Sequence, residues 1–388
     1  MFMTRTKSKN ALRLVASLAV FFCSWSGAQS PASLVPVPVI EQSHLGAKGF
    51  FYVGGQYTGE KGKEILQGQM YVEVLVPKVK KRPYPLVLFH GAGQTATNWM
   101  GTPDGRKGWA DFFVEQGYIV YMVDQPMRGR SAWHPQDGAI RMFTAANEEF
   151  QFTAGEITGT WPNAKLHTQW PGDGPLKGRM GDPVFDQFYA SQVETVVSNE
   201  ETERRIQLAG AALLDKIGPA ILLTHSQAGP FGWLIADSRP QLVKGIVAVE
   251  PSGPPFELSV IGSGKARSWG PTDIPITYSP EVKDPSELTL RREKPEYEGS
   301  PGCLLQTSPA KKLINLEKIP VMMVAAQASY HQVYDHCTAH YLEQAGVHTD
   351  YFRLQDHGIM GNGHMVMIEK NSLQIAQFID EYVARVMK

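Results

Sequence analysis

The chain has 388 residues, of which 43% are hydrophobic and 19% are charged, and its formal net charge is −1. This length suits one large globular domain with insertions, or two domains of ordinary size. The near-neutral charge offers no basic surface to nucleic acid, so we expect no nucleic-acid partner.

The first 28 residues have the pattern of a secretory signal peptide. Four basic residues between positions 5 and 13 precede an apolar run over residues 14–25, and small residues at positions 26–28 offer a cleavage site. The run is too short to cross a bilayer. Cys23 does not fit a lipidation signal, because Phe22 stands where such a signal needs a small residue. We predict a periplasmic or secreted protein, residues 29–388, with no membrane span after signal cleavage.

Apolar, strand-like segments alternate with helical segments along the remaining chain. This alternation predicts an α/β fold with a mostly parallel central sheet flanked by helices. The expected strands cover residues 49–53, 70–77, 86–89, 119–123, 220–224, 245–249, 321–325 and 350–354. The expected helices cover residues 109–116, 193–217, 230–236, 333–345 and 373–387.

Two long segments, residues 131–190 and 253–315, do not follow this alternation. The first contains several Trp, Pro and Gly residues, and the second contains many Pro, Ser and charged residues. Loops of this length within a compact domain are usually functional or separately ordered. Both follow strands of the expected sheet, so they can cover the carboxyl ends of the strands, where open α/β sheets bind ligands. We interpret them as cap insertions of one domain; surface decoration away from the site is the alternative.

Residues 221–229 place Ser226 where an apolar run stops and a run of small residues begins. A buried strand that ends in a sharp turn, followed at once by a helix, lifts a serine hydroxyl out of the sheet as a nucleophile elbow. We therefore predict that Ser226 is the nucleophile of a hydrolase. Such a hydroxyl needs a neighbouring base, and the base needs a third group that orients it.

The base is expected to be a histidine that follows the last strand. His364 lies in a glycine-containing turn just before the C-terminal helix, and such a loop can bring an imidazole to the elbow. His357 is the alternative, because it follows the strand almost directly. We favour His364, since His357 can equally be a packing residue at the strand end.

The acid is expected in an unusual place. The seventh strand carries no carboxylate at its end, whereas Glu250 comes directly after the apolar run of the sixth strand. A buried strand rarely ends in a Glu whose charge has no partner. The neighbouring strand ends in Ser226, so Glu250 can reach the same imidazole. Asp335, further along the chain, is the alternative acid.

The oxyanion hole requires backbone N–H groups beside the elbow. The third strand ends in His90 and Gly91 followed by small residues, and such folds take one donor from this position. We assign this donor to the N–H of Ala92, with Gly93 as the alternative, and the second donor to the N–H of Gln227. Residues 124–131 are expected to order the loop beside the hole.

Short motifs between residues 85 and 385 carry a family resemblance. They are His90-Gly91, residues 102–106 with Gly108-Trp109, residues 128–131, His225-Ser226-Gln227 with Gly229, Val249-Glu250-Pro251, His357-Gly358, Gly361-Asn362, and His364-Met365 with residues 371–374. On these motifs the chain resembles the α/β-hydrolases, and is most similar to secreted bacterial serine esterases whose triad acid is a Glu after the sixth strand. The resemblance implies the same roles for Ser226, His364 and Glu250. It departs from the usual elbow in that Thr224 and Ala228 occupy the glycine positions.

Two cysteines remain after signal cleavage, Cys303 and Cys337. In an oxidising compartment we expect a disulfide between them; two buried free thiols are the alternative. The bridge would tie the loop before the seventh strand to the helix that follows it.

A metal site is the alternative use of one expected helix, which carries a cluster of possible ligands: His331, Asp335, His336, Cys337 and His340. The i, i+4 spacing of His336 and His340 suits zinc. The sequence fixes no third ligand, and no Glu follows the first His. We therefore expect no metal and no other cofactor.

The predicted function is hydrolysis of a small-molecule carboxylic ester through an acyl-enzyme. The same triad is compatible with lactone, amide or C–C bond hydrolysis, and a catalytically inactive binding protein is a further alternative. Four tryptophans of the insertions indicate either a bulky apolar substrate group or cap packing: Trp133, Trp161, Trp170 and Trp269. The oligomeric state is left open.

Overall fold

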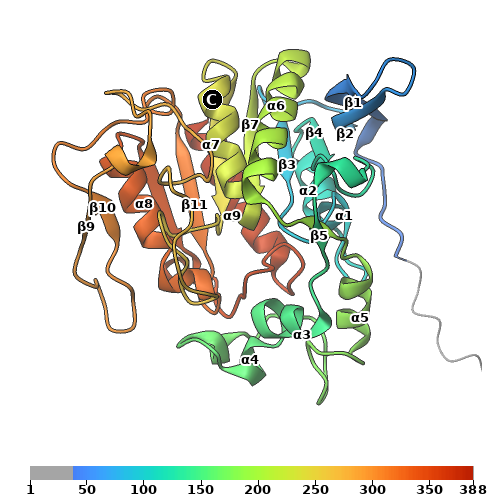
Figure 1. Cartoon of the computed structure of the whole chain (residues 1–388). Coiled ribbons are helices and arrows are strands. Elements are labelled where there is room, and N and C mark those ends of the chain that lie inside the picture. The colour runs from blue at the N-terminus through green and yellow to red at the C-terminus, as the bar shows by residue number, and fades with distance from the viewer. Residues whose placement is uncertain (1–37, 388) are drawn as a thin grey trace, which may run out of the picture. The chain divides into compact units, whose positions relative to one another are not determined.

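The computed structural model describes residues 38–387, and the predicted signal peptide lies outside them. Its centre is an eight-stranded sheet in the order β1-β2-β4-β3-β7-β8-β11-β12 (Figure 1). The strands are β1 (Leu45–Thr58), β2 (Ile65–Pro77), β3 (Leu86–Phe89), β4 (Val120–Asp124), β7 (Ala220–His225), β8 (Val243–Val249), β11 (Val321–Ala325) and β12 (Thr349–Arg353).

The direction of the strands confirms the expected α/β sheet. β1 pairs antiparallel with β2, and β2 with β4, whereas every pair from β4 to β12 is parallel. β3, β7 and β11 are buried at every position. Strands covered on both faces need apolar residues on both faces, which explains their continuous apolar runs.

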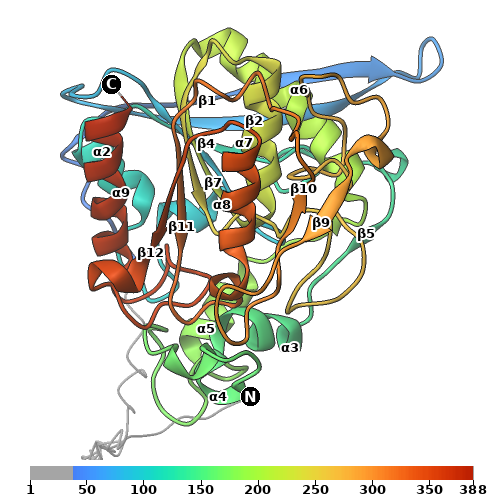
Figure 2. The same ribbon diagram turned by 90° about the vertical axis from the view of Figure 1, so that its left-hand side faces the viewer.

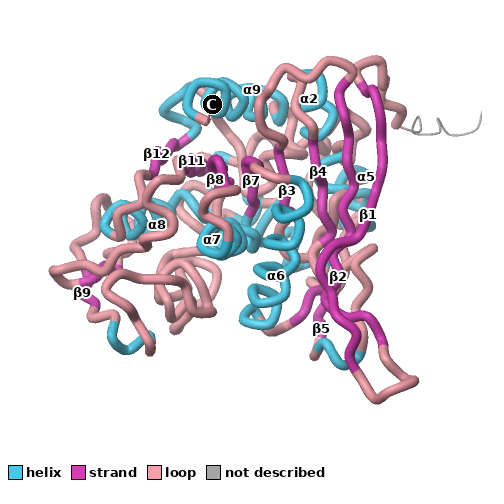
Figure 3. The backbone as a smooth tube through the Cα atoms, turned by 90° about the horizontal axis from the view of Figure 1, so that it is seen from above, coloured by secondary structure: helices cyan, strands magenta, loops and turns pink. Residues whose placement is uncertain are grey.

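Helices cover both faces of the sheet (Figure 3). On one face α6 (Asn199–Ile217), α7 (Gly229–Ser238) and α8 (Asp335–Gln344) bury an apolar cluster that includes Ile206, Phe231 and Tyr341. On the other face α2 (Trp109–Glu115) and α9 (Ser372–Val386) bury a second cluster that includes Trp109, Phe113 and Ile375. None of the described helices has both the length and the apolar character needed to cross a lipid bilayer.

One expected helix begins six residues later than its pattern indicates. Residues 193–217 are expected to be helical, but Thr195–Val196 forms strand β6, which pairs with β5 (Ile140–Arg141). The helix starts at Asn199 because the Ser198 side chain accepts a hydrogen bond from the Glu201 N–H. This is an ordinary N-cap, which satisfies a backbone donor at the first turn.

The two long segments contain short elements of their own. Between β4 and α6 lie, besides β5 and β6, η1 (Pro135–Asp137), α3 (Ala145–Glu148), η2 (Glu149–Thr153), α4 (Gly155–Thr158), η3 (Ala164–Leu166) and α5 (Pro183–Ala190). α3, α4 and α5 group together beyond one end of the sheet (Figures 1 and 2). Between β8 and β11 lie η5 (Pro285–Glu287) and an antiparallel hairpin of β9 (Leu290–Arg292) and β10 (Leu304–Gln306), beside α8 (Figure 2).

Candidate active site

Ser226 stands at a strained turn between β7 and α7. Its φ is +56°, although it is not a glycine, and a short turn, η4 (Ser226–Ala228), leads directly into α7. A left-handed conformation costs a non-glycine residue about 1–2 kcal/mol. Such strain persists only where the surroundings enforce it, and it is characteristic of a nucleophile elbow.

The elbow is tight without glycines at its two usual positions because other glycines provide the space. A Cβ atom on Gly229 would lie 2.3 Å from Pro251 Cβ, and one on Gly232 would lie 3.2 Å from Thr224 Cγ2. Gly229 thus lets α7 approach the turn after β8, and Gly232 gives room to Thr224. The turn after β8 is also joined to the elbow by a hydrogen bond: the Ser252 N–H donates to the Ser226 carbonyl at 2.8 Å.

His364 and Glu250 form a buried hydrogen bond. His364 Nδ1 lies 2.5 Å from Glu250 Oε2, and both side chains are 1% exposed. With the Nδ1–H donating to Glu250, Nε2 is the ring atom that remains available, and it has no hydrogen-bond partner among the described residues. The His225 Nε2–H donates to the His364 carbonyl (3.1 Å), which anchors His364 to the residue preceding Ser226.

Glu250 is fixed by two further donors. Its Oε1 accepts from the Ala326 N–H and its Oε2 from the Ser329 hydroxyl, each at 2.7 Å. Burial raises the pKa of Glu250 to about 7, against the lowering effects of His331 and of these hydrogen bonds. Burial, followed by repulsion from His331 in its protonated form, holds the pKa of His364 well below its usual value. The site therefore disfavours a charge on either partner alone.

The loop that carries His364 is held by a buried carboxylate that the sequence did not point to. Glu369 Oε1 lies 2.6 Å from His167 Nε2 and accepts from the Gly363 N–H at 2.9 Å, while Oε2 accepts from the Asn362 amide at 2.7 Å. His167 belongs to the segment between β4 and α6. The immediate neighbours of His364 are thus fixed by contacts from a distant part of the chain.

The segment after β3 lies against the elbow. A Cβ atom on Gly91 would stand 3.1 Å from the His225 ring and from Ser226 Cβ, so a side chain here would crowd the turn. The Ala92 N–H donates to no protein acceptor within residues 38–387. Buried Arg128 donates to the Gly91 carbonyl (2.9 Å) and to the Gln227 side-chain oxygen (3.2 Å). Arg128 therefore joins the two segments predicted to form the oxyanion hole.

The rest of the loop after β4 is ordered by charge. Asp124 Oδ2 accepts from the Arg130 backbone N–H at 2.9 Å and from its Nε at 2.8 Å, and Arg130 also pairs with Glu73 at 2.7 Å. Burial would raise the pKa of Asp124, but the hydrogen bonds from Arg130 and from the Ala96 N–H hold it below its usual value. These contacts support the expected loop-ordering role of residues 124–131.

The alternative base and acid lie elsewhere or pair elsewhere. His357, in η7 (Leu354–His357), is exposed and packs its ring against Phe352 and Phe378. Asp335 is buried and its Oδ1 lies 2.8 Å from His331 Nδ1, not against His364. The carboxylate that contacts the His364 ring is Glu250.

Aromatic side chains cover the His364 ring. Phe152 of η2 stacks on it with ring centroids 5.1 Å apart, and Tyr330 of η6 (Tyr330–Val333) lies at the same distance. Trp161 packs on Tyr330 and donates to the Ala328 carbonyl at 2.8 Å. Of the four tryptophans singled out in the sequence, Trp161 is the one tied to this cover.

The segment between β8 and β11 borders a cavity of about 800 Å³, whose apolar wall includes Phe256, Leu288 and Leu290. Arg267 and Asp273 also line it. The same two residues line a smaller cavity of about 30 Å³ that reaches Gln227 and Ser252, the neighbours of the elbow.

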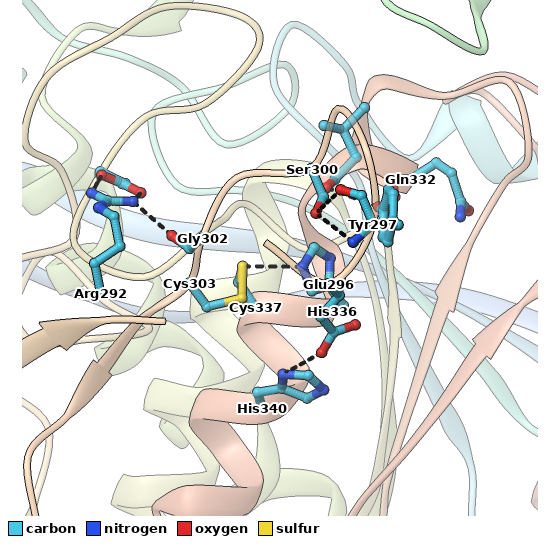
Figure 4. The surroundings of a disulfide bond; sticks show 12 residues. Arg292, Glu296, Tyr297, Ser300, Gly302, Cys303, Gln332, His336, Cys337 and His340 are labelled. Carbon is cyan, nitrogen blue, oxygen red and sulfur yellow. Dashed lines mark hydrogen bonds and ion pairs between the residues drawn. A yellow bond between two sulfur atoms is a disulfide. The ribbon is translucent and has the colours of Figure 1, made fainter. Parts of the chain in front are cut away.

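The predicted disulfide between Cys303 and Cys337 is present (Figure 4). It joins the strand region before β10 to the first turn of α8. The possible metal ligands beside it point to different surroundings: His336 contacts Cys337 and packs on Tyr297, and the half-exposed His340 pairs with Glu296 at 3.2 Å. His331 faces His364 instead.

Comparison with known proteins places the site in context. No family sequence model matches the chain. The chain is 44% identical over 373 residues, covering 96% of its own length and 97% of the relative's, to the "Probable secreted lipase phiG" of Fungal sp. (strain ATCC 74256). Its fold is similar to that of "a Novel Bacterial Esterase" solved at atomic resolution, with a TM-score of 0.56 and 22% identity over 89% of this chain and 97% of the other.

Proposed function

Because the chain belongs to the α/β-hydrolase family and is a carboxylic ester hydrolase, we propose that it works through a triad of Ser226, His364 and Glu250. The observation that carries this proposal is the buried 2.5 Å contact between Glu250 and His364 beside a serine at φ +56°. A carboxylate on one ring nitrogen leaves the other nitrogen as the base, which is the division of labour in Ser-His-acid triads.

In the first half-reaction the Ser226 oxygen attacks the ester carbonyl carbon while His364 Nε2 takes the hydroxyl proton. The carbonyl oxygen becomes an oxyanion, and the N–H groups of Ala92 and Gln227 are the proposed donors that hold it. His364 then gives its proton to the alkoxy oxygen as the ester C–O bond breaks. The alcohol leaves and an acyl-Ser226 ester remains.

In the second half-reaction a water molecule replaces the alcohol. His364 takes one proton from the water as its oxygen attacks the acyl carbon, and returns that proton to the Ser226 oxygen as the acyl–enzyme bond breaks. The products are a carboxylic acid and the regenerated serine. Glu250 orients the imidazole and offsets its positive charge in both halves without taking the proton.

Replacement of the nucleophile tests the proposal most directly. The variant Ser226→Ala should lose nearly all turnover of p-nitrophenyl esters, because it lacks the hydroxyl that forms the acyl intermediate. The far-UV circular dichroism spectrum and the melting temperature should stay close to those of the wild type. A fluorophosphonate probe should label the wild type and not the variant. Retained turnover in a folded variant would overturn the assignment.

We further propose that the segments 131–190 and 253–315 shape the substrate space. Phe152 of the first covers the His364 ring, and the second borders the cavity of about 800 Å³. Phe256, Leu288 and Leu290 would contact an apolar acyl or alcohol group of the ester, as expected for a relative of a lipase, and the charged residues of the same lining would face its polar part.

Secretion is part of the same proposal. The relative is named a secreted lipase, and residues 1–28 have the composition of a signal peptide. Expression in a host with a secretory pathway should release a protein whose N-terminal sequence starts after Ala28. Recovery of the full-length chain from the cytoplasm alone would contradict this.

A further inference from the structure

A second buried imidazole lies flat against the proposed base. The rings of His331 and His364 have centroids 4.7 Å apart and planes 7° apart. Both side chains are 1–2% exposed. Two stacked imidazoles in a protein interior repel each other if both are protonated. This contact therefore favours states in which at most one of the two rings carries a charge.

The nitrogens of His331 are engaged away from Ser226. Its Nδ1 lies 2.8 Å from Asp335 Oδ1, and its Nε2 lies 3.3 Å from the Tyr334 hydroxyl. Both partners come from its own turn and the start of α8. His331 therefore offers His364 the face of its ring and no hydrogen bond.

Ser329 couples the position of His331 to the Glu250–His364 pair. Its Oγ accepts from the His331 backbone N–H at 3.2 Å and donates to Glu250 Oε2 at 2.7 Å. The same Oε2 contacts His364 Nδ1. The backbone of His331 and the ring of His364 are thus both positioned by one carboxylate oxygen.

The charge state of His331 follows from its surroundings. Six groups face it: Glu250 directly after β8, His364 of the loop before α9, Arg267 of the segment 253–315, and Tyr330, Tyr334 and Asp335 from its own turn and the start of α8. Burial is the largest effect and lowers the pKa of His331 to about 4. His331 is therefore neutral at the pH at which an esterase of this kind would act.

A neutral aromatic ring attracts a cation placed over its face, whereas a protonated His331 would repel one. During the proposed reaction His364 becomes an imidazolium each time it accepts a proton. We propose that His331 is a positioning residue for His364: its neutral ring fixes the plane of the His364 imidazole and supports the imidazolium that forms during ester hydrolysis. This inference rests on the proposed triad.

The test compares two replacements of His331. His331→Phe keeps a flat ring against His364, whereas His331→Gln keeps a polar group and removes the ring. We expect His331→Gln to lower kcat for p-nitrophenyl acetate by about 5- to 20-fold with KM within twofold, since a cation–ring contact in a dry site has this magnitude. The same loss of imidazolium stabilisation should move the acid limb of its kcat profile to lower pH by about 0.7 to 1.3 units. His331→Phe should stay within about threefold of the wild type.

His340→Gln is the matched control, because His340 lies on α8 but pairs with Glu296 at the surface, and its kcat should be unchanged. The fraction of folded enzyme in each sample is counted by fluorophosphonate labelling. Equal losses in the Phe and Gln variants, or an unchanged Gln variant, would overturn the inference. If the Gln variant does not fold, the Phe variant decides: a loss above tenfold per labelled site contradicts a role for the ring face. Failure of the triad itself appears separately, as turnover by Ser226→Ala.

Discussion

At the residue scale, the position of Glu250 at the end of a strand determines which carboxylate contacts the proposed base. Glu250 follows β8 directly at φ +47°, and this turn directs its side chain to the loop that carries His364. Asp335 is equally buried but is engaged by His331. Two carboxyl groups thus lie near the base with different partners, which makes their roles separable by substitution.

We expect Glu250→Gln to lower kcat by about 10³- to 10⁴-fold, because an amide can neither offset the imidazolium charge nor enforce the Nδ1–H form of His364. Asp335→Asn should keep kcat within about tenfold, since it acts on His364 only through His331. Both are measured on p-nitrophenyl acetate at saturating substrate with matched labelling of Ser226. The opposite ranking would move the acid to Asp335.

The sequence could point to Ser226, Glu250 and His364 because each directly follows a strand or precedes a helix in a pattern that few other residues share. It could not point to Glu369, which resembles an exposed residue at a helix start and is explained only by His167 of a distant segment. The sequence also does not indicate that His331 lies against His364, because the two residues are distant in the chain. Its i, i+4 partner Asp335 made it look like part of a metal-binding helix face.

At the scale of elements, the buried strands were predictable and the ends of exposed ones were not. β3 and β11 match their expected bounds because their apolar runs end sharply. β1 extends from Leu45 to Thr58, far beyond the expected 49–53, because its outer part is an exposed hairpin that apolar periodicity does not reveal. The short helices of residues 131–190 have no periodicity long enough to detect.

The disulfide between Cys303 and Cys337 joins two elements separated by 34 residues. A cross-link of this span lowers the conformational entropy of the unfolded chain, which raises the free energy of unfolding by about 3–4 kcal/mol at 25 °C. We expect a Cys303→Ala/Cys337→Ala double variant, or the reduced wild type, to lose stability of this order in denaturant unfolding. Reductant should have no further effect on the double variant. An unchanged unfolding midpoint after reduction would contradict a stabilising bridge.

At the scale of the whole molecule, buried ionisable groups shape the dependence of stability on pH. Burial raises the pKa of Glu148 and of Glu203 to about 8, and burial lowers the pKa of His90 to about 3. A carboxyl with a raised pKa binds its proton more tightly in the folded state, so stability falls as pH rises from its unfolded pKa to its folded pKa. A histidine with a lowered pKa destabilises the fold only below about pH 6.5.

Below pH 6.5 the carboxyl groups and His90 change the free energy of unfolding in opposite directions as the pH rises. Between pH 6.5 and 8 only the carboxyl groups of this set still change it. The free energy of unfolding should therefore fall across this interval. Glu148 has no hydrogen-bond partner for either carboxyl oxygen among the described residues, so Glu148→Gln should remove about 2 kcal/mol of the decline. Urea unfolding at pH 6.5, 7.2 and 8 measures it. The exposed Glu200→Gln is the control and should leave the slope unchanged; a Glu148→Gln profile parallel to the wild type would contradict the assignment.

The close approach of Gly229 to Pro251, together with the bond from Ser252 to Ser226, makes the nucleophile and the acid parts of one rigid block. The proposed base, His364, lies on a separate loop, which is held by the hydrogen bonds of Glu369 to the Gly363 N–H and to His167. We therefore expect the loop that carries His364 to unfold first under mild heating or low denaturant. Activity should then be lost while the sheet, its helices and the strained turn at Ser226 are still folded.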